Sequence, residues 1–191
     1  MTCELNKEQL VALVEQAKQG DEAAFSYLYE YYLSPIYRFV FFRVKSHQEA
    51  EDLAQTVFIK AWNNLGSYQK QPGASFGSWL YTIARNSVID FWKKRKEIFL
   101  DDNLLDVLNK KETGGQENEH LERKEKWEIL QKALEILSVE QQEVMILKLI
   151  NGLSNREISQ MVGKNEAAIR QLQYRALKAL KQYLKDNKLY E

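Results

Sequence analysis

The sequence predicts an all-α protein made of two small helical domains joined by a flexible acidic linker. Three observations support this fold class: the 191 residues include only two prolines and eight glycines, 28% of the residues are charged, and apolar residues recur at intervals of three and four. Segments with the alternating pattern of strands are scarce. A hydrophobic content of 45% suffices for one sizeable core or for two small ones.

The division into two domains follows from the distribution of charge. Residues 97–125 carry 9 acidic and 4 basic side chains, lose the helical apolar period and include Gly114-Gly115. Residues 1–96 carry 12 basic and 10 acidic groups, and residues 126–191 carry 11 and 8. Because loops longer than about 15 residues are uncommon within compact domains, we expect domains at 1–96 and 126–191 and a linker at 97–125. The alternative is a surface loop inside one domain.

Capping signals mark the helices of the first domain. Asn6 and Gln9 have the spacing of a capping box before the first helix, and Asp21 opens a longer second helix. Ser46 and Glu49 repeat the capping-box spacing before a third helix. These signals predict three consecutive helices before the turn-rich stretch SYQKQPGAS.

The third helix, which we expect to end at Gly66, has more apolar residues than one narrow buried stripe needs. The stripe that faces the core is predicted to contain Ala50, Leu53, Ala54, Val57, Ala61 and Leu65. Beside or beyond it lie Phe58, Ile59 and Trp62, together with Glu51, Asp52 and Gln55. A surface that mixes apolar and acidic groups is suited to docking on a partner. The alternative is that the whole apolar face is buried.

The next segment, SFGSWLYTIARNSVIDFWKKRK, combines aromatic rings with cations. Its core side is predicted to contain Leu80, Ala84, Val88 and Phe91. Trp79 lies instead on a polar face with Thr82, Asn86, Asp90 and Lys93. An aromatic ring offers about 1–3 kcal/mol of stacking per unpaired base, and nearby cations hold phosphates. This face therefore suits single-stranded nucleic acid, although a core position for the indole is the alternative.

The second domain contains the pattern of a helix-turn-helix. Ser154 and Glu157 have capping-box spacing, Gly163 provides a turn, and Asn165 can cap a following helix. On that helix the core arc is predicted to contain Ile169, Leu172, Ala176, Leu180 and Tyr183. The opposite arc is basic and fits the major groove of duplex DNA, where Arg and Gln hydrogen-bond base edges and Lys neutralises phosphate. The alternative is an ordinary solvated helix face.

These motifs together resemble a small bacterial sigma factor of the extracytoplasmic-function group, from about residue 20 to residue 184. The resemblance is carried by GDEAAFSYLYEYY with EDLAQTVFIKAW, by SFGSWLYTIARNSVIDFWKKRK, and by LSVEQQEVMILKLINGLSNREISQMVG followed by AIRQLQYRALKAL. It implies a specificity subunit that binds core RNA polymerase, recognises the −10 and −35 promoter elements and opens the DNA. Many members have arginine followed by leucine where this chain has Leu172-Gln173.

The resemblance also implies roles for individual residues. The residues implied in core-polymerase binding are Asp52, Gln55, Phe58 and Trp62. Those implied in binding the −10 element as single strand are Lys70, Ser75, Trp79, Arg85, Asn86, Lys93, Lys94 and Arg95. Those implied in binding the −35 element as duplex are Lys164, Arg170, Gln171, Tyr174, Arg175 and Lys178.

The expected partners are core RNA polymerase, promoter DNA and a separate anti-sigma protein, and the resemblance implies no catalysis. We expect no cofactor and no metal, because Cys3, His47 and His120 lie too far apart in sequence to build a Cys/His zinc site. A reducing cytoplasm fits the single cysteine, and no apolar run of transmembrane length or signal peptide is present, so membrane insertion is not expected.

Three other functions compete with this interpretation. A helix-turn-helix regulator that acts without joining polymerase would explain residues 126–191 but would leave EDLAQTVFIKAW and the Trp79 face without a role. An enzyme acting on nucleic acid would need a metal cluster, a phosphate loop or a paired nucleophile, none of which is evident. A helical protein-interaction module would give no reason for the outward cations of the last helix.

Overall fold

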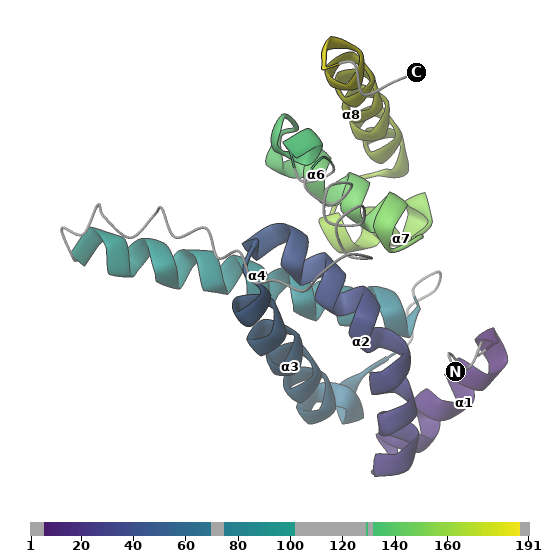
Figure 1. The fold of residues 1–191 in the computed structure, drawn as a ribbon. Coiled ribbons are helices and arrows are strands. Elements are labelled where there is room, and N and C mark those ends of the chain that lie inside the picture. Colours follow the sequence, from purple (N-terminus) through teal and green to yellow (C-terminus); the bar gives the residue numbers. More distant parts are fainter. Residues whose placement is uncertain (1–5, 70–74, 102–128, 130–131, 188–191) are drawn as a thin grey trace, which may run out of the picture. The chain divides into compact units, whose positions relative to one another are not determined.

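The computed structural model describes residues 6–69, 75–101, 129 and 132–187, and every regular element in these ranges is helical (Figure 1). The chain divides into two compact units, residues 1–104 and 105–191. The predicted all-α class with two helical domains is confirmed. The linker expected at 97–125 lies outside the described residues from residue 102 onward.

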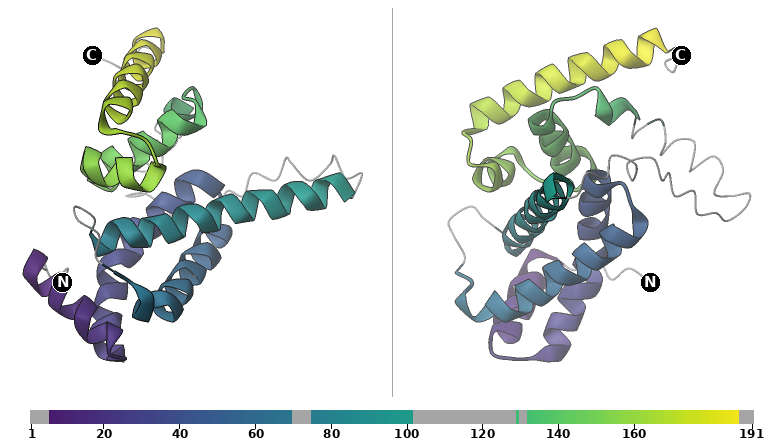
Figure 2. Two further views of the ribbon diagram at one scale, coloured as in Figure 1. Left: turned by 180° about the vertical axis from the view of Figure 1, so that it is seen from behind. Right: turned by 90° about the vertical axis from the view of Figure 1, so that its left-hand side faces the viewer.

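The described residues of the first unit form four long helices. They are α1 (Lys7–Lys18), α2 (Glu22–Val44), α3 (His47–Asn64) and α4 (Phe76–Asp101), with a 3₁₀ turn, η1 (Leu65–Ser67), between the last two. The central helix is α2, which packs against α1, α3 and α4, while α3 also packs against α4. The C-terminal part of α4 projects beyond α2 and α3 (Figure 2). This helix continues to Asp101, so residues 97–101, which the sequence assigns to the linker at 97–125, are helical.

The predicted caps are present at the starts of these helices. Asn6 and Gln9 form a reciprocal capping box with bonds of 2.8 and 2.9 Å, and Asp21 accepts from the backbone N–H of Ala24. At α3 the box is only half formed, because Ser46 accepts from the N–H of Glu49 while the Glu49 carboxylate accepts from Arg95 of α4.

The core of the first unit lies where α2, α3 and α4 meet. Among its fully buried side chains are Leu28, Ile36, Phe39, Val40, Val57 and Leu80. Three of the four residues predicted for the core side of α4 are buried as expected: Leu80, Ala84 and Val88. The end of α3 differs from the prediction. The α-helix ends at Asn64, and Gly66 lies within η1, because the chain tightens there to let Tyr68 N–H bond the Leu65 carbonyl.

The second unit contains the expected helix-turn-helix. Its described elements are α6 (Val139–Met145), a π-helical turn η2 (Ile146–Ile150), α7 (Asn155–Val162) and α8 (Glu166–Asp186). The turn between α7 and α8 is built as predicted: Ser154 and Glu157 form a capping box, Gly163 adopts φ of 70°, and Asn165 caps α8. The long α8 packs against α6 and α7, with Ile169 and Ala176 on its buried side.

Before α6, residues 129 and 132–135 are also helical. Among the described helices of both units, none is both long enough and apolar enough to cross a bilayer.

Candidate protein- and nucleic-acid-binding surfaces

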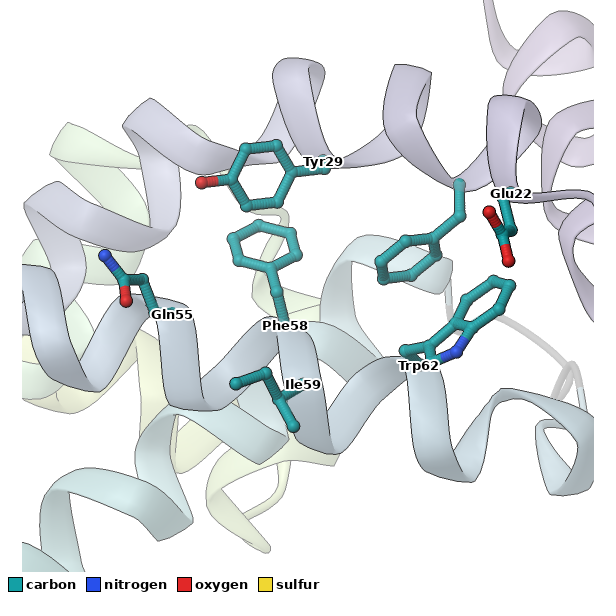
Figure 3. A pocket seen from close by; sticks show the side chains of 7 residues that line it. Glu22, Tyr29, Gln55, Phe58, Ile59 and Trp62 are labelled. Carbon is teal, nitrogen blue, oxygen red and sulfur yellow. The ribbon is translucent and has the colours of Figure 1, made fainter.

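A groove of about 470 Å³ runs between α2 and α3. We call it the α2–α3 groove. It is lined by Glu22, Phe25 and Tyr29 of α2 and by Gln55, Phe58, Ile59 and Trp62 of α3 (Figure 3). Three of the four residues predicted to dock on a partner, Gln55, Phe58 and Trp62, therefore share one surface. The fourth, Asp52, is exposed one turn before Gln55 and does not line the groove.

Two aromatic pairs join the walls of the α2–α3 groove. Phe25 and Trp62 have ring centroids 4.9 Å apart, and Tyr29 meets Phe58 edge-on at 4.7 Å. Figure 3 shows Tyr29 and Phe58 facing each other across the groove. Phe58 is only 4% exposed, so it forms the floor and belongs to the core as much as to the surface. Ile59 is 61% exposed and offers the most accessible apolar contact.

The contribution of α2 to the groove was missed in the sequence. Glu22, Phe25 and Tyr29 lie within GDEAAFSYLYEYY, but the sequence pattern gives none of them a role in docking. A weak signal existed: Phe25 and Tyr29 are four residues apart on α2, as Phe58 and Trp62 are on α3, so each helix carries a matching pair of rings on one face. Their pairing requires the packing of the two helices to be known.

A second hollow, of about 360 Å³, lies between α3 and α4. We call it the α3–α4 pocket. Its lining residues are Lys60, Asn64, Ser67, Trp79, Ile83 and Asn86. The predicted nucleic-acid residues Trp79 and Asn86 meet here, and the pocket adds the polar side chains of Asn64 and Ser67 and the cation of Lys60. An aromatic ring, two amides and an ammonium around one hollow can stack on a base, hydrogen-bond its edge and balance a phosphate charge.

The indole of Trp79 is held in place by two neighbouring rings. Its centroid lies 5.0 Å from that of Tyr68 and 5.4 Å from that of Phe76, and these two rings meet edge-on at 5.6 Å. Both Tyr68 and Phe76 are buried, so Trp79 stands half-buried on a fixed support. Burial raises the pKa of the Tyr68 hydroxyl, and the charge of Glu15 raises it further, so this ring is neutral at physiological pH.

The remaining residues predicted to bind single strand have different environments. Lys93 and Lys94 are exposed on α4, and Arg85 is half-buried. Arg95 pairs with Glu49 at 2.7 Å and lies over the rings of Phe91 and Trp92.

The predicted nucleic-acid residue Ser75 caps the start of α4. Its Oγ accepts from the backbone N–H of Ser78 at 3.1 Å, and the Ser78 hydroxyl donates to the Ser75 carbonyl at 2.7 Å. Its side chain therefore has a structural role at the helix start. The predicted residue Lys70 lies outside the described residues.

In the second unit, α8 presents an exposed basic face. Gln171, Tyr174, Arg175 and Lys178 are exposed, as the pattern predicts, and Tyr174 is 68% exposed. Two flanking cations are paired with carboxylates. They are Arg170, 3.6 Å from Glu166, and Lys164, 2.9 Å from Glu140 of α6.

The Leu172-Gln173 pair has a structural place on α8. Gln173 donates to the Asn155 side chain at 2.9 Å and so fastens α8 to the start of α7, while Leu172 is half-buried. Metal-binding geometry does not arise within the described ranges, where no three His, Cys, Asp or Glu side chains cluster.

Comparison with known proteins gives family matches for both units. Residues 28–98 match the family model of Sigma-70 region 2, and residues 127–180 match that of Sigma-70, region 4. The ECF RNA polymerase sigma factor BldN of Streptomyces coelicolor is 35% identical over 179 residues, which cover 94% of this chain and 67% of BldN. The RNA polymerase sigma factor YlaC of Bacillus subtilis is 32% identical over 155 residues, covering 81% of this chain and 88% of YlaC.

Solved structures show the same fold. The sigma factor RpoE in complex with the anti-sigma factor NepR from Bartonella quintana aligns with a TM-score of 0.69 and 25% identity, covering 84% of this chain and 96% of RpoE. The structure of CnrH in complex with the cytosolic domain of CnrY aligns with a TM-score of 0.69 at 22% identity, over 93% of this chain and 98% of that one.

Proposed function

The chain belongs to the extracytoplasmic-function group of RNA polymerase sigma factors, and from this premise we propose which of its surfaces performs each step of transcription initiation. As an alternative sigma factor it serves RNA polymerase in initiation at promoters. The assignment of steps to surfaces rests on one observation: the two units carry three chemically different surfaces. These are an aromatic groove, a polar pocket with a fixed indole, and a basic recognition helix.

The α2–α3 groove is the site for core polymerase. It presents apolar area at Ile59 and Trp62 together with the carboxylate of Glu22, and Asp52 is exposed outside it on α3, which suits a helical partner with apolar and basic side chains. The paired rings give the groove a fixed shape before the partner arrives, so little conformational entropy is lost on binding. The buried ring of Phe58 packs against Tyr29 and forms the floor of the groove.

The α3–α4 pocket is the site for the −10 element. A base that leaves the duplex costs a few kcal/mol in lost stacking and pairing. Stacking on the supported indole of Trp79, together with hydrogen bonds from the amides of Asn64 and Asn86, can offset that cost. Lys93 and Lys94, exposed farther along α4, are placed to hold the adjoining phosphates.

The exposed face of α8 is the site for the −35 element as duplex. Gln171 and Arg175 are the candidates for base edges in the major groove, where Gln pairs with adenine and Arg with guanine. Lys178 lies about two turns beyond Gln171 and is suited to phosphate contact.

We further propose that the chain acts in the cytoplasm as a binding factor without enzymatic activity of its own and that a separate anti-sigma protein restrains it. The support is by analogy, since RpoE of Bartonella quintana is solved in complex with an anti-sigma factor. The exposed apolar area of the α2–α3 groove is a surface that such an inhibitor could cover.

Gel filtration with core RNA polymerase tests the docking proposal. The chain is expected to co-elute with core enzyme, and Trp62→Ala is expected to weaken the complex at least tenfold because a ring in a fixed groove is typical of binding hot spots. Tyr27→Ala is the matched control, because Tyr27 is an exposed aromatic of α2 outside the groove. Failure to co-elute, together with specific duplex binding by the chain alone, would favour a helix-turn-helix regulator that acts without polymerase.

A further inference from the structure

The last turn of α1 reaches the ring cluster that supports Trp79. The inner face of α1 is buried at Val14 and Ala17, and the helix packs against both α2 and η1. In the last turn of α1, the ammonium of Lys18 lies over the ring of Tyr68, 6.0 Å from the ring centroid. A basic side chain of α1 therefore adjoins the residue that follows η1.

Tyr68 connects α1 to the α3–α4 pocket. Its ring is buried, meets Phe76 edge-on at 5.6 Å and lies 5.0 Å from the indole of Trp79, which lines the pocket. Its backbone N–H donates to the Leu65 carbonyl, which ties the residue to η1. The carboxylate of Glu15 in α1 is near enough to raise the pKa of the Tyr68 hydroxyl beyond the effect of burial. Side chains of α1 thus act on a ring that packs against the indole.

Lys18 is suited to holding this ring in place. Its side chain is only 25% exposed, so its methylene stem covers apolar surface. Its positive charge is attracted to the electron-rich face of an aromatic ring. The Glu15 carboxylate lies 3.5 Å from the ammonium, and because Glu15 is mostly exposed, this pair adds little to stability. The pair instead restricts the rotamers of the lysine and so keeps the ammonium over Tyr68.

The support of Trp79 comes from two helices. Phe76 is packed by Tyr32 of α2, with ring centroids 5.6 Å apart. Tyr68 is packed by Lys18 of α1. An indole whose supporting rings are fixed loses little freedom when a base stacks on it, whereas a loosened support adds an ordering cost to binding. The contact from α1 therefore affects how tightly the pocket binds a base.

We propose that Lys18 is a positioning residue of the α3–α4 pocket, which holds the ring of Tyr68 against the indole of Trp79. It acts through Tyr68 and not by contact with the strand. This inference rests on the proposed role of the pocket in −10 binding. It extends that role to α1, which precedes the residues that match the Sigma-70 region 2 model. The ligand whose binding depends on Lys18 is an unpaired base, so the contribution of phosphate contacts is unaffected.

An NMR spectrum of the isotope-labelled, full-length chain tests the position of the indole. The indole N–H resonance of Trp79 is identified by its absence in Trp79→Phe. Because the Tyr68 ring lies 5.0 Å from the indole, a displaced ring changes the local magnetic field and shifts this resonance. Lys18→Met keeps an unbranched side chain but removes the cation, and it is expected to shift the Trp79 resonance. The resonance of Trp92, farther along α4, is expected to stay in place.

Lys18→Arg keeps a cation over the ring and is expected to leave the Trp79 resonance near its wild-type position. An unshifted Trp79 resonance in Lys18→Met would overturn the proposal. Equal shifts of the Trp79 and Trp92 resonances would show that the first unit is loosened as a whole, and would also overturn it.

Affinity for two single strands tests the effect on binding. Both are fluorescein-labelled strands of about 12 nucleotides, one with a mixed sequence and one in which every base is replaced by an abasic residue. Lys18→Met is expected to weaken binding of the base-bearing strand about two- to threefold and to leave binding of the abasic strand unchanged. The slope of log affinity against log salt is expected to stay at its wild-type value, because no phosphate contact is lost. Lys18→Arg is expected to restore the affinity.

A shifted resonance in Lys18→Met without loss of affinity for the base-bearing strand would overturn the proposal, because the position of the indole would then not matter for binding. Equal weakening of both strands would mean that the charge of Lys18 acts on phosphates, and the positioning role would be wrong.

Lys185→Met is the matched control for loss of one positive charge, because Lys185 is an exposed lysine in the last turn of α8, in the other unit. It is expected to leave the Trp79 resonance and the preference for the base-bearing strand unchanged. The same loss of preference in Lys185→Met and Lys18→Met would mean that only net charge matters and would overturn the proposal.

Trp79→Ala separates failure of this inference from failure of the function on which it rests. If Trp79→Ala abolishes the preference for the base-bearing strand while Lys18→Met keeps it, only the role of Lys18 is overturned. If Trp79→Ala keeps the wild-type preference, the pocket assignment itself fails, and the role of Lys18 in base binding fails with it.

Discussion

The guanidinium of Arg95 lies 2.7 Å from the carboxylate of Glu49, so an ion pair joins the C-terminal part of α4 to the first turn of α3. Arg95 also lies over the rings of Phe91 and Trp92, with its guanidinium carbon 5.8 and 5.6 Å from their centroids. A cation with these contacts is engaged within the protein. Its role is thus different from that of the exposed neighbour Lys94, although the sequence groups the two in one basic run.

Replacing Arg95 by Met is therefore expected to affect stability more than DNA binding. Loss of a partly exposed ion pair of about 1 kcal/mol lowers the melting temperature of a domain of this size by about 4–8 °C. Lys94→Met is expected to show the reverse pattern, with an unchanged melting temperature and weaker binding of single strands. Thermal denaturation and fluorescence anisotropy measure the two effects. Equal loss of affinity in both variants would count against this division of roles.

The α2–α3 groove predicts a contrast between neighbouring residues. Ile59→Ser is expected to weaken core-polymerase binding about tenfold without changing stability, because Ile59 is largely exposed. Phe58→Ala is expected to cost about 3–5 kcal/mol of unfolding free energy, because its ring is buried against Tyr29. Urea denaturation and binding to immobilised core enzyme distinguish the two. A stable Phe58→Ala variant would show that the floor of the groove is less tightly packed than described.

The turn between α7 and α8 predicts a backbone effect at Gly163. Its φ of 70° lies in the left-handed region, and a Cβ there would meet no atom within 4 Å. Gly163→Ala is thus expected to cost about 1–2 kcal/mol through backbone strain alone, whereas Gly163→Asn should cost less, because Asn tolerates this conformation. Chemical denaturation of the two variants measures the difference. Equal stability of both variants and wild type would contradict the assigned turn geometry.

The pair between Lys164 and Glu140 predicts a gain of function in duplex binding. Because the ammonium is 2.9 Å from a carboxylate of α6, part of its charge is compensated before DNA arrives. Glu140→Gln is expected to raise affinity for duplex DNA about two- to threefold at low salt and to lose that advantage at high salt. Mobility shifts at two salt concentrations provide the measurement. Weaker binding at low salt would mean that Glu140 orients Lys164 for contact.

Tyr68 predicts a loss of stability at alkaline pH. Burial and the charge of Glu15 raise its pKa above the ordinary value of 10.0. The native state then keeps a proton that the unfolded chain releases. The contribution of the protonated Tyr68 hydroxyl to the free energy of unfolding is therefore present below pH 10.0 and is lost as the pH rises through the raised pKa. Between pH 10.0 and the raised pKa, the free energy of unfolding should fall more steeply with pH in the wild type than in Tyr68→Phe. If the free energy of unfolding depends on pH in the same way in both proteins, the Tyr68 hydroxyl does not cause the loss of stability at alkaline pH.

Much of the local structure could be predicted from the sequence. The capping residues Asn6, Asp21, Ser154 and Asn165 fix helix starts through bonds to backbone groups three residues away, and such bonds depend on local spacing alone. The exposed arc of α8 followed in the same way from its period.

What the sequence did not predict depends on how helices cross. Phe25 faces Trp62 across 37 residues of chain, and Lys60 meets Ser87 across 27. No periodicity within one helix indicates such partners. The α2 wall of the groove and the cation of the pocket therefore became visible only with the tertiary structure.

Run-off transcription with core RNA polymerase, on DNA from upstream of the chain's own gene, tests the central claim most directly. The account predicts defined transcripts that form only when the chain is present and that fade with Trp62→Ala or Asn86→Ala. It predicts that Tyr27→Ala, outside both surfaces, supports transcription at the wild-type level. Absence of any transcript, with no co-elution of the chain and core enzyme, would contradict the assignment of these surfaces to polymerase and promoter.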